Sequence, residues 1–166
     1  FEHALRGDRA AAGHCGGCGG GRNTLGIESH GDVKGCSAMS SDDFIAGNVR
    51  TSRIADLWES APELRFMRDF RIDDLWGFCR DCYYGEVCRG GCLWTAATLM
   101  GRRGNNPYCH HRALELIARG RRERLLQVAP AAGLVRDRAQ FVLQEEEAPR
   151  DWIESLPALP GGMPYV

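Results

Sequence analysis

Five of the eight cysteines in this chain lie in one stretch from Cys79 to Cys109. In that stretch Cys79-Arg-Asp-Cys82 is followed by Cys88-Arg-Gly-Gly-Cys92 and then by Cys109. A metal ion or an iron-sulfur cluster needs thiolates that converge on tight turns, whereas a disulfide framework rarely needs such closely spaced thiols. We therefore interpret this stretch as metal-ligating.

The other three cysteines lie nearer the N-terminus. Cys15 and Cys18 belong to the glycine-rich loop His14–Gly21, and Cys36 follows it. Cluster sulfides and thiolates accept hydrogen bonds from backbone N–H groups, and glycine allows the backbone to approach them closely. This loop is thus a second candidate for ligation, although a flexible glycine linker would have a similar composition.

Length and charge limit the classes of protein that this chain can represent. Its 166 residues suit a small cluster-binding domain with appendages and exclude a large catalytic barrel. The net charge of −1 does not indicate a nucleic acid or an anionic membrane as partner. With neither a long apolar run nor a signal peptide, we expect a cytoplasmic, reducing location, where cysteines usually serve metal or redox chemistry. The first residue is Phe, as in an excerpt of a longer protein.

Short elements should position the N-terminal cysteines. Two strands, at 23–28 and 33–36, flank the turn Ser29–Asp32 and predict a β-hairpin. This hairpin would bring Cys36 back beside Cys18.

Helices and turns are expected to fill the chain between residues 47 and 101. We expect a turn at Gly47-Asn48-Val49 and then a helix capped by Thr51-Ser52. Pro62 can open another helix, and a further one is predicted to begin at about Gly91 and end at Gly101.

The last third of the chain is expected to be more irregular. The pattern predicts a longer helix from about His110 to Val128, a possible edge strand at Gln140–Gln144, and a final segment of some twenty residues that is poorly ordered without a partner. The expected fold class is small α+β, in which a β-hairpin and short helices wrap around two clusters, followed by a C-terminal helix and an irregular tail. The expected divisions are an N-terminal linker or helix end at 1–12, the cluster domain at 13–115 and the C-terminal segment at 116–166.

The full cysteine pattern resembles the seven-cysteine signature of the SPASM domain, named for the subtilosin, pyrroloquinoline quinone, anaerobic sulfatase and mycofactocin maturation systems. The pattern reads Cys18, twelve residues, Gly31, four residues, Cys36, a gap, Cys79-x2-Cys82-x5-Cys88-x3-Cys92, a gap, and Cys109. The segments Leu25-Gly26-Ile27, Gly77-Phe78-Cys79 and Asn106-Pro107-Tyr108-Cys109 add to the resemblance.

This resemblance implies two [4Fe-4S] clusters in a domain attached to a radical S-adenosylmethionine barrel. Carried over by position, the first auxiliary cluster would be held by Cys15, Cys18, Cys36 and Cys92, and the second by Cys79, Cys82, Cys88 and Cys109. The implied partners are a radical S-adenosylmethionine domain or protein and a precursor peptide. Cys15 is the least fixed ligand, since the upstream thiol varies in position among family members.

Counting the thiols adds a mechanistic inference. Eight cysteines fill two four-iron clusters completely, which favours electron transfer or structural support over direct coordination of a substrate. If Cys15 is not a ligand, the first cluster keeps an open iron and that inference weakens.

The chain lacks the Cys-x3-Cys-x2-Cys motif that holds the S-adenosylmethionine-cleaving cluster. Thr95 stands where Cys88-x3-Cys92 would need its third cysteine, and Ala11 precedes Cys15-x2-Cys18 at the corresponding place. The chain should therefore not cleave S-adenosylmethionine by itself, and S-adenosylmethionine would enter only through a radical domain or protein outside this sequence. No catalytic base is assigned.

Three functions of different classes remain open. The chain is the auxiliary-cluster module of a radical enzyme that modifies ribosomal peptides or proteins, a free two-cluster ferredoxin-like electron carrier, or a structural zinc module with two four-cysteine sites. In the two functions that involve iron-sulfur clusters, Arg80 and Arg89 are candidates for raising the reduction potential of a cluster, because each lies beside a ligand cysteine in the sequence.

Overall fold

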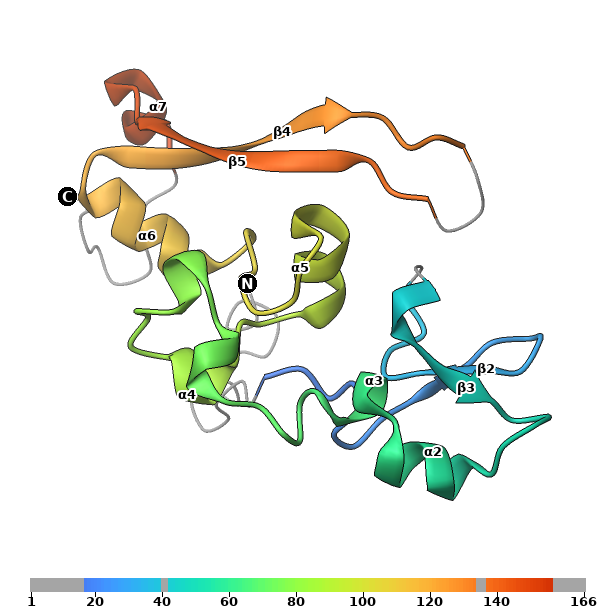
Figure 1. The fold of residues 1–166 in the computed structure, drawn as a ribbon. Helices are drawn as coiled ribbons and strands as arrows, with labels where there is room; N and C mark the ends of the chain where they lie inside the picture. The colour runs from blue at the N-terminus through green and yellow to red at the C-terminus, as the bar shows by residue number, and fades with distance from the viewer. Residues whose placement is uncertain (1–16, 40–41, 134–136, 157–166) are drawn as a thin grey trace.

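The structure is a computed structural model that describes residues 17–39, 42–133 and 137–156 (Figure 1). It combines short helices with two small antiparallel sheets. In chain order, with η marking 3-10 turns, the elements are β1 (Gly26–Ile27), β2 (Asp32–Lys34), η2 (Asp42–Phe44), β3 (Ile45–Asn48), α2 (Ile54–Ser60), α3 (Pro62–Arg65), η3 (Ile72–Asp74), η4 (Gly77–Cys79), α4 (Gly85–Cys88), α5 (Leu93–Met100), α6 (His110–Ala118), β4 (Arg121–Ala129), β5 (Gln140–Glu147) and α7 (Arg150–Glu154).

The first sheet has the strand order β1-β2-β3. Strands β1 and β2 pair antiparallel, with Ile27 opposite Val33, so the predicted hairpin is present. The turn expected at Gly47-Asn48-Val49 is wrong in part, because Gly47 and Asn48 belong to β3, which pairs with β2. Gly47 has φ +150°, and a Cβ there would lie 2.6 Å from Leu57 Cδ2, so glycine lets β3 lie against helix α2.

Two helices cover this sheet and complete its core. Pro62 begins α3, as predicted, and Leu64 of that helix is fully buried in one cluster with Val33 and Leu57. The predicted cap of α2 is wrong: its N-cap is Arg53, without a side-chain cap bond, and the Thr51 hydroxyl donates to the carbonyl oxygen of Asn48 instead.

A second apolar cluster lies next to the cysteines. Its buried members are Met39, Met67 and Leu93. Leu93 opens α5, which begins close to the predicted position and ends at Gly101, whose φ of +70° stops the helix. This cluster therefore joins residues from segments far apart in sequence, which is what a site built from dispersed cysteines requires.

The predicted helix from His110 to Val128 is wrong over its second half. Helix α6 ends at Ala118, Gly120 adopts φ +66°, and Arg121–Ala129 continues as strand β4. The edge strand predicted at Gln140–Gln144 is present and extends to Glu147, and it pairs antiparallel with β4. Cross-strand ion pairs contribute, because Arg122 Nη2 lies 2.7 Å from Glu146 Oε1. The pairing of β4 with β5, the next element along the chain, therefore outweighs the helical pattern of this segment.

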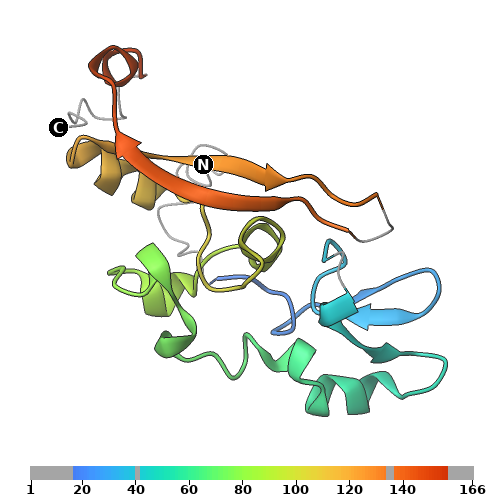
Figure 2. The same cartoon turned by 45° about the horizontal axis from the view of Figure 1, so that its top comes forward.

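The β4–β5 hairpin extends over helices α5 and α6, on the opposite side of the molecule from the first sheet (Figures 1 and 2). Arg138 Nη1 donates to the carbonyl oxygen of Ala97 at 2.7 Å and ties the hairpin to α5. The boundary expected after residue 115 falls within α6. In the expected irregular tail, Arg150–Glu154 forms α7, while residues 157–166 lie outside the described residues.

None of the helices in the described ranges has the length and apolar character needed to cross a lipid bilayer.

Candidate metal centre

Seven of the eight predicted ligand cysteines lie in the described part of the chain, and no disulfide joins any two of these seven. The eighth, Cys15, lies outside the described residues. Cys79 is buried, Cys92 is exposed, and the other five are half-buried. The thiols are thus placed near the surface of a small core, as ligands of a bound metal group can be.

Cys18 and Cys36 come together as the hairpin prediction requires. Both pack against the second apolar cluster, whose member Leu93 directly follows Cys92. Their loops are in close contact, because a Cβ at Gly20 would lie 2.9 Å from the carbonyl oxygen of Gly35. The Gly20 amide also donates to Cys18 Sγ at 3.4 Å. We call Cys18, Cys36 and Cys92 the first cysteine group.

Cys79, Cys82 and Cys109 form a second cysteine group. Burial raises the pKa of the Cys79 thiol, and the neighbouring Cys109 and Cys82 raise it further. A hydrogen bond from the Asn106 backbone and the charge of Arg112 act in the opposite direction. Cys82 and Cys109 are therefore both close enough to act electrostatically on Cys79, although the three cysteines come from η4, the turn after it and the start of α6.

Cys88 lies at the junction between the two groups. It ends α4, and the next three residues, Arg89, Gly90 and Gly91, have φ values of +54°, +77° and +73° before Cys92 is reached. The Cys18 loop reaches this junction, because a Cβ at Gly17 would lie 3.0 Å from the Cys88 carbonyl oxygen. The Cys88–Cys92 loop therefore lies against the loop that carries Cys18, and it follows Cys82 of the second group along the chain.

The donor set fits an iron-sulfur cluster. The ligand atoms available are thiolates, and backbone N–H groups of Gly20 and Asn106 donate to two of the sulfurs. Such N–H···S bonds spread the negative charge of a thiolate-ligated cluster, and the positive φ values at Gly90 and Gly91 let the chain turn tightly between ligands. Thiolate alone would also suit zinc.

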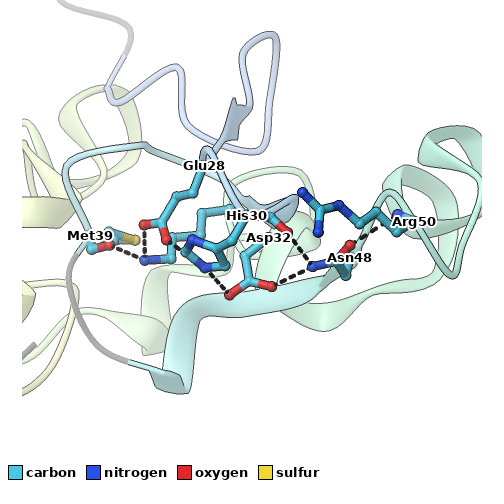
Figure 3. Close-up of polar contacts among 7 residues, drawn as sticks. Glu28, His30, Asp32, Met39, Asn48 and Arg50 are labelled. Atoms are coloured by element: carbon cyan, nitrogen blue, oxygen red, sulfur yellow. Dashed lines mark hydrogen bonds and ion pairs between the residues drawn. The ribbon is translucent and has the colours of Figure 1, made fainter. Parts of the chain in front are cut away.

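A different group of ligand-type side chains lies on the turn of the first hairpin (Figure 3). His30 Nε2 lies 2.7 Å from Asp32 Oδ2 and 3.2 Å from Glu28 Oε2. The buried ammonium of Lys34 donates to Glu28 Oε1 at 2.5 Å and to the Met39 carbonyl oxygen at 2.7 Å, and Asn48 Nδ2 donates to Asp32 Oδ1 at 2.9 Å. These contacts stabilise the hairpin that carries the chain from Cys18 to Cys36, and the Lys34 charge opposes binding of a cation.

Buried polar residues around the second group were not expected from the sequence. Arg112 is 4% exposed and contacts Glu123 of β4, with two nitrogen–oxygen distances of 2.5 Å. It also donates to Asn105 Oδ1 at 2.7 Å and lies over the ring of Phe78. Arg112 precedes the buried Leu116 by four residues, and this helical spacing is the signal that would have placed it on the inner face.

Comparison with known proteins matches residues 18–83 to the SPASM family, described as an iron-sulfur cluster-binding domain. The chain is 39% identical over 77 residues to mycofactocin maturase MftC of Mycobacterium ulcerans, covering 46% of this chain and 20% of that protein. It is 32% identical over 96 residues to AdoMet-dependent heme synthase of Methanosarcina barkeri, covering 58% of this chain and 26% of that protein. The mycofactocin maturase of Mycolicibacterium smegmatis is 32% identical over 77 residues, covering 46% of this chain and 19% of that protein. The matched segments thus span about a fifth to a quarter of the length of these relatives.

Proposed function

Residues 18–83 of this chain belong to the SPASM family of iron-sulfur cluster-binding domains, and from that premise we propose that the chain is the auxiliary-cluster module of a radical S-adenosylmethionine enzyme. The substrate class that we propose is a ribosomally made peptide or protein, and the role is electron transfer together with seating of the substrate. Mycofactocin maturases among the relatives support this class.

The module would hold two [4Fe-4S] clusters. We propose the ligand sets Cys15, Cys18, Cys36 and Cys92 for the first, and Cys79, Cys82, Cys88 and Cys109 for the second. The observation that supports the proposal is that Cys18 and Cys36 pack against one apolar cluster that includes Leu93, the neighbour of Cys92, while Cys82 and Cys109 interact electrostatically with Cys79. Thiolate donors would suit zinc equally well, so the preference for iron-sulfur clusters rests on the family match over residues 18–83.

Bound clusters would accept and release single electrons, and the chain's own residues prepare their surroundings. The amides of Gly20 and Asn106 donate to sulfur. Burial of Cys79 keeps water from its ligand atom, and Met67 and Leu93 give the first group an apolar wall. These residues therefore bind, orient and shield, while S-adenosylmethionine would be handled by a separate radical domain or protein.

Metal analysis of anaerobically prepared protein tests the proposal. We expect brown protein with broad absorbance near about 400 nm and roughly eight iron and eight sulfide per chain. Cys18→Ala and Cys79→Ala should each lose about four iron while the other cluster remains. Colourless protein with two zinc ions would refute the proposal.

A second assay separates the module from a free electron carrier. The clusters should support peptide modification only when a radical S-adenosylmethionine enzyme and a precursor peptide are present. If the chain instead transferred electrons between unrelated redox proteins in the absence of the radical enzyme and the peptide, the result would favour a free electron carrier.

A further inference from the structure

Arg103 is a half-buried cation on the apolar side of the first cysteine group. Its guanidinium carbon lies 3.8 Å from the centre of the Phe66 ring and 5.5 Å from that of Phe44. Burial lowers the pKa of the guanidinium from its usual value, while Glu63 and Asp74 act in the opposite direction. An arginine side chain stays protonated in proteins, so this position carries a positive charge.

The two rings connect Arg103 to the first cysteine group. Phe44 and Phe66 pack against the same three buried residues, Met39, Met67 and Leu93, as Cys18 and Cys36 do. Apolar side chains therefore lie between the charge and these thiols. Electrostatic interactions act more strongly through such a medium than through solvent.

Other nearby arginines are placed differently. Arg80 is exposed to solvent. Arg89 is half-buried, but its guanidinium donates to the carbonyl oxygens of Met67 and Glu86 and faces the ring of Phe70. Exposed charge is screened by salt and solvent. Arg80 is thus a weaker candidate for tuning the first site.

We propose that Arg103 is a positioning residue that raises the reduction potential of the cluster held by the first cysteine group. Reduction adds a negative charge to the cluster, and a nearby cation stabilises that reduced state. Arg103 also offsets the half-buried carboxylates of Glu63 and Asp74, so its loss would leave this face more negative. The inference rests on the proposed function, because it requires a cluster at the first group.

The test is a potentiometric titration of the iron-loaded chain, followed by electron paramagnetic resonance. Arg103→Gln and Arg103→Met remove the charge, and Arg103→Lys keeps it. The matched control is Arg102→Gln, since Arg102 is an exposed neighbour that lies over the Trp76 ring. We expect both uncharged variants to lower the midpoint potential of one cluster, with iron content unchanged. Arg103→Lys should keep most of the wild-type midpoint, and Arg102→Gln should keep both midpoints.

Several results would overturn the inference. Unchanged midpoints in fully loaded Arg103→Gln and Arg103→Met would do so, as would an equal shift in Arg102→Gln. Loss of iron in both uncharged variants, with the surviving cluster at its wild-type midpoint, would assign Arg103 a purely structural role. Wild-type protein without iron would refute the proposed function itself, and that failure is distinguishable before any variant is made.

Discussion

The buried pair between Arg112 and Glu123 should control how firmly the C-terminal hairpin holds the second cysteine group. Its side chains are 5% and 16% exposed, and Glu123 lies on β4. Arg112 reaches Asn105, next to the Asn106 backbone that bonds to Cys79. The pair therefore connects the hairpin to the backbone around the buried thiol.

The substitution Glu123→Gln would leave the Arg112 charge buried without its anionic partner. Removing one member of a buried pair costs about 3 to 5 kcal/mol. We expect about 3 kcal/mol here, because the glutamine oxygen still accepts one hydrogen bond. Since about 1.4 kcal/mol corresponds to a factor of ten, this is roughly a hundredfold increase in local opening.

Native-state hydrogen exchange of the iron-loaded protein, under anaerobic conditions, measures this opening without requiring reversible unfolding. Peptides from α6 and β4 should exchange roughly a hundredfold faster in Glu123→Gln, and iron should leave the second site first. Glu145→Gln is the matched control, because Arg121 and Glu145 are 36% and 49% exposed and such pairs contribute at most about 1 kcal/mol. The double variant Arg112→Met/Glu123→Leu should recover only part of the loss, because it removes the uncompensated charge but leaves the buried Asn105 Oδ1 without its donor.

The reasoning fails if Glu123→Gln and Glu145→Gln exchange at the same rate in α6 and β4.

Three further predictions concern iron loading and the fold. Cluster assembly requires thiolates, so cluster reconstitution followed by absorbance should accelerate from about pH 7 to about pH 9, and a flat profile would contradict ligation by cysteine. In Gly21→Ala, at φ +72°, the new Cβ would lie 2.2 Å from the Leu64 carbonyl oxygen, so the first site should lose iron. The control Gly120→Ala, at φ +66° with nothing within 4 Å of the new Cβ, should cost only about 1 kcal/mol of stability. Equal iron contents in the two variants would argue against the clash at Gly21. Removing iron with a chelator under reducing conditions should collapse the fold in far-ultraviolet circular dichroism, and a compact iron-free form with disulfide-linked thiols would refute the metal-dependent fold.

Local chemistry predicted the elements that depend on a few neighbouring residues. The hairpin followed from a glycine-containing turn between apolar pairs, helix α3 from Pro62, and the end of α5 from Gly101. Proline limits its own backbone angles, and glycine permits angles that other residues avoid, so these effects do not depend on a distant partner. The cysteine spacing was informative for the same reason, since iron-sulfur ligation restricts residue type and separation together.

The elements that the sequence could not predict depend on distant contacts. Arg121–Ala129 has a helical pattern of arginine and leucine, yet pairing with Gln140–Glu147 makes it a strand. Strand β3 was interpreted as a turn because Gly47 and Asn48 are typical turn residues, while its place is fixed by β2 and Leu57. Arg103 gave no local signal at all, since only its contacts with two phenylalanine rings distinguish it from the adjacent Arg102.

The left-handed run Arg89-Gly90-Gly91 has a consequence for how the protein matures in the cell. Only these three residues separate Cys88 from Cys92, so the two ligands cannot move far apart. Delivery of iron to either set of thiols should therefore bring the remaining set closer to its final arrangement, and the second cluster to form should assemble faster than the first.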